Sequence, residues 1–217
     1  ASNVFVLSLN KGIKCDGSGC NVTLVAGDDV ILGSSAWVKS SGYLSKVEIT
    51  ATDVVQLQST SYVSASYIRV SADSMSMTSA TKLNTDARGY SEAQGDGKPG
   101  VHTFTSTGTY ASTGSGAGAG HGGDGGNSCH KFSSASLPVG GSSYGSATWP
   151  VTYGSGGGKA AYMNVGRNDT GGAGGGRIHL TVDDTLVMNG IITANGGNGV
   201  FNTWRYGYDS SGGGGSG

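Results

Sequence analysis

Apolar and polar residues alternate along four stretches of the chain, and the four stretches follow one pattern. In each of them, three alternating apolar or small residues precede an Asp, and two more alternating apolar residues follow it. The first copy consists of Val22, Leu24, Ala26, Asp28, Val30 and Leu32. The other copies are centred on Asp53, Asp73 and Asp184, and the copy at Asp73 is one residue shorter. Alternation with a period of two predicts extended strands that bury one face.

A further apolar or small pair follows each Asp after eight and ten residues, as Ala36 and Val38 do in the first copy. Each copy therefore predicts three short strands separated by corners, with the Asp at the first corner, where its carboxylate can bond backbone N–H groups. Stacking of such coils would form the apolar ladders Val22–Val47–Ile68–Ile178, Leu24–Ile49–Val70–Leu180 and Leu32–Leu57–Met77–Met188. We therefore expect an all-β fold, a parallel β-helix (solenoid).

A long glycine-rich stretch separates the third copy from the fourth. Of the 42 glycines, 7 lie in residues 1–90 and 35 in residues 91–217. We expect a large Gly-rich insertion that leaves one corner and returns to it, folded as turns and short extended segments because long structureless loops are uncommon. The expected division is residues 1–20 as an N-terminal strand and Cys loop, 21–86 as coils 1–3, 87–176 as the insertion, 177–195 as coil 4, and 196–217 as the start of a further Gly-rich excursion.

The composition excludes several classes of protein. The formal net charge is −1, only 12% of the residues are charged, and Lys and Arg do not cluster, which argues against nucleic acid as a partner. No apolar stretch is as long as a membrane span. The chain starts at Ala1 and stops within a glycine run, so we expect a slice of a longer repetitive array. The polar, small-residue β-composition indicates an extracellular or surface protein.

Glycine-rich motifs recur through the second half of the chain. The series includes Arg88-Gly89-Tyr90, the run from Gly118 to Gly126, Gly154-Ser155-Gly156-Gly157-Gly158, Gly172-Ala173-Gly174-Gly175-Gly176-Arg177-Ile178 and Asn189-Gly190-Ile191-Ile192. Over residues 80–217 it resembles the large Gly-rich repeat proteins of algal and heterokont flagellar hairs, namely tubular mastigonemes and the related sexually induced proteins. The resemblance implies a secreted, glycosylated fibre subunit without catalytic activity.

Four residues are candidates for covalent modification. Asn21 and Asn168 each begin an Asn-X-Thr sequon and are predicted glycosylation sites, with Asn168 the better acceptor because it lies in a loop. Cys15 and Cys20 flank a short Gly-containing loop. Their spacing favours a disulfide over a metal knuckle, because no second ligand pair follows at zinc spacing. The partner of Cys129 stays open.

Two apolar segments are candidates for contacts between subunits. The N-terminal strand could add to the open end of a neighbouring solenoid, where unpaired backbone groups invite another strand. The aromatic cluster near the C-terminus could form a subunit contact, and equally it could hold the second excursion onto the solenoid. The residues predicted to make assembly contacts are Val4, Phe5, Val6, Trp204, Tyr206 and Tyr208.

We expect no metal site and no cofactor. His121, Asp124, Cys129 and His130 are potential ligands, but their spacing matches no strong zinc pattern. Calcium stays open as an alternative at the corner carboxylates, which lack the Gly-Asp nonapeptide repeat of calcium-binding β-rolls. These carboxylates belong to Asp28, Asp53, Asp73 and Asp184.

We also expect no catalytic residues. The adjacent Asp183 and Asp184 would diverge along a strand, whereas glycoside cleavage needs convergent carboxylates. The glycines from Gly171 to Gly176 precede a strand, whereas a nucleotide-binding glycine loop follows one and opens a helix.

The sequence thus predicts an extracellular structural protein, a glycosylated subunit of a filament or of a surface or flagellar hair, whose partners are copies of itself. The alternative is a surface adhesin or carbohydrate-binding β-helix module, and the third possibility is a polysaccharide lyase or hydrolase.

Overall fold

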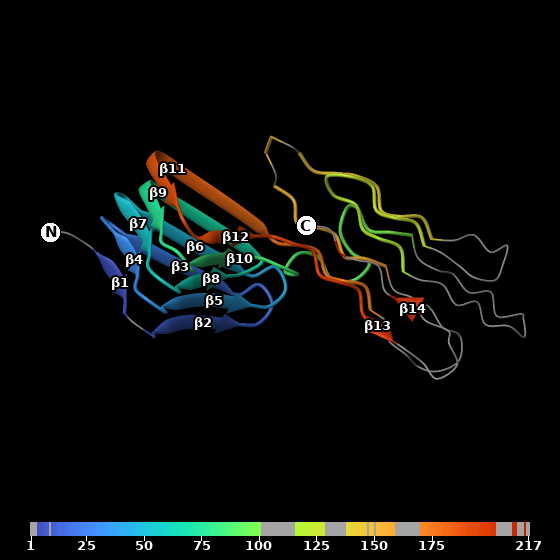
Figure 1. The fold of residues 1–217 in the computed structure, drawn as a ribbon, viewed down its shortest axis with the longest axis horizontal. Coiled ribbons are helices and arrows are strands. Elements are labelled where there is room, and N and C mark those ends of the chain that lie inside the picture. Colours follow the sequence, from blue (N-terminus) through green and yellow to red (C-terminus); the bar gives the residue numbers. More distant parts are fainter. Residues whose placement is uncertain are drawn as a thin grey trace, which may run out of the picture. The chain divides into compact units, whose positions relative to one another are not determined.

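The chain forms two compact units, which we call the stacked-strand unit (Ala1–Thr85 with Arg177–Ala194) and the glycine-rich unit (Asp86–Gly176 with Asn195–Gly217) (Figure 1). The computed structural model describes residues 4–8, 10–100, 116–128, 138–146, 148–149, 151–158, 170–202, 210–211 and 215. Within these residues the regular structure consists of strands without helices, so the expected all-β class is confirmed.

The stacked-strand unit is built from short strands that alternate between buried and exposed residues. They are β1 (Phe5–Leu7), β2 (Gly12–Asp16), β3 (Asn21–Ala26), β4 (Val30–Leu32), β5 (Trp37–Ser41), β6 (Lys46–Ala51), β7 (Val54–Leu57), β8 (Tyr62–Ser64), β9 (Tyr67–Met77), β10 (Lys82–Asn84), β11 (Arg177–Met188) and β12 (Ile191–Thr193). The glycine-rich unit contains an antiparallel pair, β13 (Phe201–Asn202) and β14 (Ser210–Ser211).

Every strand pair in the stacked-strand unit is parallel and joins equivalent positions of successive repeats. Val47 pairs with Val22 and Ile68, and Ile68 pairs with Ile178. The other two expected ladders are also observed as strand partners. Parallel pairing follows because each repeat re-enters the stack with the same direction and register.

The strands form two sheets that enclose one core. The seven-stranded sheet has the order β1-β4-β7-β9-β6-β3, with β11 paired to β9, and the five-stranded sheet has the order β12-β10-β8-β5-β2. Strand β9 belongs to two walls, because its first half pairs with β6 and its second half with β7. The inward residues make a dry core, in which Leu32, Ile49, Leu57 and Ile68 are fully buried.

The Asp corner differs from the expectation in two repeats. Strands β9 and β11 continue through Asp73 and Asp184, so these corners do not separate two strands. The third repeat is one residue shorter, which leaves no loop residue there, and β11 takes up its extra residue as a register shift between Val182 and Thr185. The first two Asp corners are joined by a hydrogen bond. The backbone N–H of Val54, in the second repeat, donates to the Asp29 carboxylate, in the first repeat, at 3.2 Å.

Residues 1–20 contribute a partial repeat to the stack rather than a separate N-terminal segment. Phe5 pairs with Val30, and Ile13 pairs with Val38. The signal in the sequence was the six-residue step from Leu7 to Ile13, which also separates the matching positions of the next three repeats. The alternation alone did not predict it, because this partial repeat has no first strand and no Asp at the corner before Phe5.

The second corner of every repeat but the last contains a residue with left-handed backbone. The φ angles are 56° at Asn10, 58° at Ser35, 61° at Thr60 and 64° at Ala80. Non-glycine residues rarely adopt this region. Stacking contributes to holding the corner, since the Ser35 and Thr60 hydroxyls are hydrogen-bonded at 2.8 Å.

In the glycine-rich unit the backbone hydrogen bonds recur every three residues. Gly154 and Gly157 donate to the carbonyls of Gly175 and Gly172. Three further segment pairs show the same step: Tyr90 and Ala93 donate to Gly154 and Gly157, Gly197 and Val200 to Ala173 and Thr170, and Gly141 and Tyr144 to Gly118 and His121. A period of three without bonds inside a segment is the pattern of polyproline-II-type helices.

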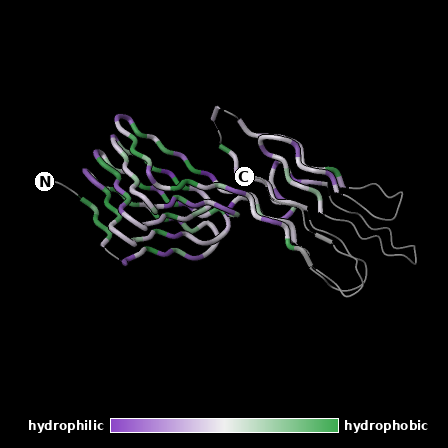
Figure 2. Tube along the Cα trace, in the orientation of Figure 1, coloured by the Kyte–Doolittle hydropathy of each residue, from purple (hydrophilic) through white to green (hydrophobic). Residues whose placement is uncertain are grey.

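These segments form a bundle and not a flat sheet. Residues 170–176 are bonded to three other segments, at 89–90, 154–157 and 197–200, whereas a strand in a sheet has two neighbours. The expectation of turns and short extended segments is therefore refined to packed threefold helices. Figure 2 shows hydrophobic residues along the stacked strands and mostly neutral residues along the described segments of the glycine-rich unit.

Glycine is required where these helices touch. A Cβ atom on Gly141 would lie 1.7 Å from the Gly97 carbonyl oxygen, and one on Gly174 would lie 1.8 Å from that of Gly154. By contrast, a Cβ atom on Gly122 would meet nothing within 4 Å. The requirement resembles that of the collagen axis, where only glycine fits.

Candidate functional site

Cys15 and Cys20 form a disulfide that closes the corner between β2 and β3, with Cα atoms 5.9 Å apart. The Ser40 hydroxyl donates to the Cys20 carbonyl at 2.7 Å, which ties this corner to the next layer. On the same strand as Cys15, the Lys14 ammonium lies 2.7 Å from the Asp16 carboxylate. The hydrogen bond from Lys14 and a second one from Ser41 lower the pKa of Asp16.

The sequon at Asn21 lies on the outer surface. Asn21 is the first residue of β3, and both Asn21 and Thr23 are exposed, while Val22 between them points into the core. The alternation of β3 turns both sequon positions outward, so the Asn21 side chain is accessible. Asn168 lies outside the described residues.

The N-terminal residues expected to make assembly contacts lie on the first layer of the stack. Val4 is 45% exposed and Val6 is 56% exposed, while Phe5 between them packs against the core and pairs with Val30. The other residues expected to make assembly contacts, Trp204, Tyr206 and Tyr208, lie outside the described residues.

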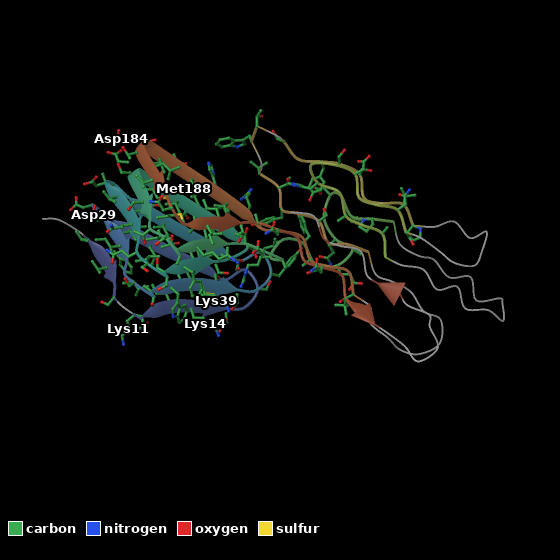
Figure 3. The ribbon with its side chains drawn as sticks, viewed as in Figure 1. Lys11, Lys14, Asp29, Lys39, Asp184 and Met188 are labelled. Atoms are coloured by element: carbon green, nitrogen blue, oxygen red, sulfur yellow. A yellow bond between two sulfur atoms is a disulfide. The ribbon has the colours of Figure 1, made fainter. Side chains whose placement is uncertain are left out.

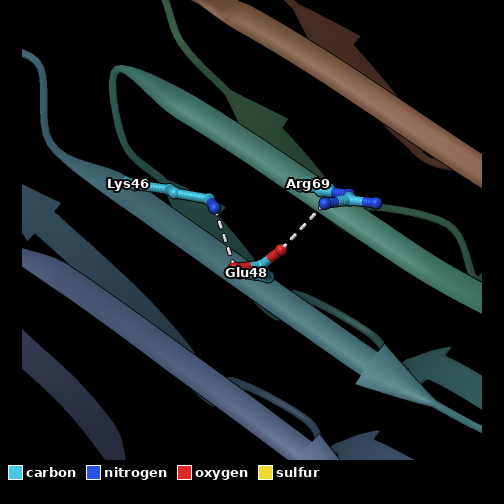
Figure 4. A network of polar contacts seen from close by, with 3 residues as sticks. All are labelled: Lys46, Glu48 and Arg69. Atoms are coloured by element: carbon cyan, nitrogen blue, oxygen red, sulfur yellow. Dashed lines mark hydrogen bonds and ion pairs between the residues drawn. The ribbon is translucent and has the colours of Figure 1, made fainter.

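A polar network crosses the outer wall of β6 and β9 (Figure 4). Glu48 accepts from Lys46 at 2.8 Å and from Arg69 at 3.2 Å. The bond from Lys46 and the charge of Arg69 hold the pKa of Glu48 below its usual range. A carboxylate that stays ionised in this way is unsuited to act as a general acid.

The same wall carries an aromatic ring between two cations. The Tyr67 ring centroid lies 3.9 Å from the Arg177 guanidinium and 5.6 Å from the Lys46 ammonium. Such contacts stabilise the outer wall. The sequence reasoning followed only the inward ladders, and the outward row Lys46–Tyr67–Arg177 would have revealed this contact.

The carboxylates proposed for calcium lie in a stack of corners. The Asp53 N–H donates to the Asp28 carbonyl at 3.0 Å, and the Ser74 N–H donates to the Asp53 carbonyl at 2.9 Å. Figure 3 labels Asp29 and Asp184 on this part of the unit. Over the described residues, no three His, Cys, Asp or Glu side chains are grouped as a metal site. The structure therefore adds no support for calcium.

His121 and Asp124 have separate hydrogen-bond partners. His121 Nε2 lies 3.2 Å from the Thr152 hydroxyl, and the Asp124 carboxylate accepts from the Ser143 N–H at 2.6 Å. Cys129 and His130, the other two potential ligands, lie outside the described residues. Asp183 and Asp184 are adjacent and exposed on β11.

A depression of about 350 Å³ opens on the glycine-rich unit beside His121. Its lining is His121, Gly122, Ser143, Tyr144, Gly145 and Ser146. The Tyr144 ring meets the His121 ring edge-on at 4.7 Å, and the Ser155 hydroxyl donates to the Tyr144 oxygen at 2.8 Å. The backbone N–H of Trp149 donates to the hydroxyl of the lining residue Ser146, and the Trp149 side chain is 61% exposed. Sequence reasoning noted His121 only as a potential metal ligand.

None of the described segments forms a helix long and apolar enough to cross a membrane. Comparisons of the chain with protein-family models, with curated proteins and with solved structures give no significant match. The functional proposal therefore rests on the geometry described above.

Proposed function

We propose that the chain is an extracellular structural protein, a subunit of a filament or of a surface hair of the flagellar type, whose stacked-strand unit is a parallel β-helix (solenoid). The observation that carries this proposal is the continuous parallel pairing from the first layer to the last, with one register shift within β11. Each layer is hydrogen-bonded to the next, so force along the stack acts on many backbone bonds together. An extended, in-register stack suits a mechanical role.

The chemistry of the first layer supports an extracellular location. The Cys15–Cys20 disulfide belongs to an oxidising compartment. A glycan on the exposed Asn21, and a second on Asn168, would hydrate a surface that has few charged side chains. The proposal includes no catalytic activity, because the Glu48 carboxylate stays ionised between two cations and Asp183 and Asp184 are neighbours on one strand.

Electron microscopy of the chain secreted from eukaryotic cells tests this proposal. We expect regular filaments and a mass above that of the polypeptide, and Asn21→Gln should remove one glycan without changing the far-UV circular dichroism. The matched control is Asn84→Gln, which alters an Asn outside any sequon. A chain that stays monomeric at every concentration would contradict the proposal.

The depression at His121 favours a second function, that of an adhesin or carbohydrate-binding module. Its volume suits a small ligand, and the hydroxyl groups of its Ser and Tyr residues provide hydrogen bonding. Trp149, which is bonded through its backbone to the lining residue Ser146, is exposed and offers an apolar ring face. On a glycan array, selective binding that is lost in Trp149→Ala and kept in Val151→Ala would support this function. Release of reducing ends from a polysaccharide would instead support the third possibility, a lyase or hydrolase.

A further inference from the structure

The last layer of the stack leaves its core-facing residues uncovered. Leu186 and Met188 on β11 are 46% and 45% exposed, whereas their partners Met75 and Met77 one layer below are each 1% exposed. On the outward side of the same layer, Ile191 on β12 is 53% exposed. Met188 is labelled in Figure 3. An apolar row that is buried in one layer and exposed to solvent in the next indicates that a further layer covers this face.

The first layer presents the opposite open edge. Within the described residues, β1, β2 and β3 each pair with one strand only, as do β11 and β12 at the other end. One edge of each of these strands therefore carries backbone N–H and C=O groups without a ladder partner. Phe5, Leu7 and Ile13 line this end next to the core.

The two ends terminate the same apolar columns. Following strand partners from layer to layer, Leu186 leads through Met75, Val55 and Val30 to Phe5. The columns end in Leu186 and Phe5, Met188 and Leu7, Ile178 and Val22, Leu180 and Leu24, and Ile192 and Ile13. The columns that end in Leu186, Met188 and Ile192 have five layers, whereas those that end in Ile178 and Leu180 have four. A second copy whose first layer lies about 4.8 Å beyond the last layer would thus continue the columns of Leu186, Met188 and Ile192 in register. The other two columns would resume after one empty layer.

We propose that β11 and β12 of one copy receive β1 and β2 of the next, so that copies join head to tail and two walls of the strand stack continue across the joint. This inference rests on the proposed filament and names its contact. The faces differ, so the contact is heterologous and does not close on itself, which gives a filament and not a ring or dimer.

The contact is made by short segments of strand. Residues Thr185–Met188 of β11 and the 3 residues of β12 would pair with β1 and β2, which have 3 and 5 residues. Ladder hydrogen bonds would supply affinity and would fix the register, as they do when a strand adds to the edge of a sheet.

The outward residues at the joint are also compatible. No two like charges would face each other in the extended ladders, which would juxtapose Val187 with Val6 and Thr193 with Lys14. The exposed Ile191 would continue the column of Gly12, over which the Trp37 ring lies so closely that a Cβ on Gly12 would be 2.0 Å from it. Ile191 would therefore meet an apolar surface.

Two variants block one end each. Leu186→Lys/Met188→Lys places charges on the last layer at positions that tolerate exposure, as natural edge strands do. Val6→Pro removes the N–H of β1 that points away from β4, since Phe5 N–H and Leu7 C=O make the bonds to that neighbour. The matched control is Val139→Lys, which is 65% exposed in the glycine-rich unit.

Sedimentation and electron microscopy of the full chain test the joint. We expect the wild type and Val139→Lys to form filaments, and the double Lys variant to raise the dissociation constant by about 100-fold or more, because charges would be buried in an apolar contact. Val6→Pro should also stay monomeric. A mixture of the two blocked chains should form dimers only, because each retains one complementary end.

The outcomes separate this inference from the proposed function. If the double Lys variant, folded by circular dichroism, still forms filaments, the head-to-tail contact is wrong while the filament stands. If the wild type never polymerises, both fail, and a different partner covers the last layer. Failure of the two blocked chains to dimerise on mixing, with each one folded and monomeric alone, also overturns the proposed contact.

Discussion

The two units of this chain reach a packed state by opposite means. The stacked-strand unit turns every second side chain inward and buries a continuous set of Val, Leu, Ile, Ala and Met. The described residues of the glycine-rich unit bury one hydrophobic side chain, Ala117, and are linked by backbone hydrogen bonds between segments. The first unit therefore depends on side-chain volume, and the second depends on the absence of side chains at its contacts.

This difference predicts which substitutions each unit tolerates. In the strand stack, removing atoms from the core leaves a cavity, while an outward position accepts most residues. In the glycine bundle, adding a single carbon at a contact forces backbones apart, while removing side chains costs little. The predictions below test the contrast in order of decreasing effect.

Leu57→Ala should cause the largest loss. Leu57 is fully buried between Leu32 and Met77, and truncation of such a residue costs about 3–4 kcal/mol in the free energy of unfolding. Urea unfolding followed by circular dichroism measures it. Val25→Ala, at an outward position that is 66% exposed, is the control and should change the free energy by less than about 0.5 kcal/mol. Equal losses in the two variants would contradict a core made by alternation.

Gly141→Ala should destabilise the glycine-rich unit by about 2–3 kcal/mol, because its new Cβ would lie 1.7 Å from the Gly97 carbonyl oxygen and 2.8 Å from the Gly120 nitrogen, both backbone atoms. Gly126→Ala is the matched control, since its Cβ would meet nothing within 4 Å. Hydrogen exchange resolved by peptide should quicken in residues 86–176 for the first variant alone. Unchanged exchange in Gly141→Ala would refute the close-packed bundle.

Much of the strand stack could be predicted from the sequence, because its information is carried by side chains. The columns that contain Val47, Leu57 and Met77 are read directly from the alternation, and the observed partners agree. The half repeat at Phe5 and Ile13 was missed because it lacks the Asp that marked the others. Strand β9 continues through Asp73 because the third repeat is one residue shorter than the others. The sequence shows the shorter repeat, but the pairing of β9 with both β6 and β7 shows that the strand stays continuous.

The glycine bundle was far less predictable, for a physical reason. A period of three can be recognised in a sequence when every third residue is of another type than the two between. Here glycine occupies both the positions that contact a neighbouring segment and the positions that face solvent. Gly141 and Gly126 are the same residue in the sequence, yet only the first is enclosed. The depression at His121 could not be predicted for the same reason, because its shape depends on the paths of the surrounding backbone segments. The outward position of Asn21, in contrast, can be read from the alternation of apolar and polar residues along β3.

Ala80→Gly should stabilise the strand stack by about 0.5 kcal/mol, because the left-handed backbone at this exposed corner strains any side chain with a Cβ. The control is Ala36→Gly, at a fully buried position for which no left-handed backbone is recorded, and it should destabilise. Thermal unfolding of both variants shows whether each substitution raises or lowers the stability. A loss of stability in Ala80→Gly would show that the stacked corners do not store this strain.

The smallest effect concerns the outer wall, where neither packing rule operates. Because Lys46 and Arg69 lower the pKa of Glu48 in the folded state, its contribution to stability is complete above the ordinary Glu value of 4.5 and is lost as the pH falls through the lowered value. Glu48→Gln should therefore cost about 0.5 kcal/mol at pH 7 and less at pH 3, which lies below the ordinary Glu value. Urea unfolding at the two pH values measures the difference, and salt near 1 M should reduce the cost at pH 7. An equal cost at both pH values would show that Glu48 contributes through packing and not through its charge. The outer wall would then be stabilised by side-chain packing, as the core is.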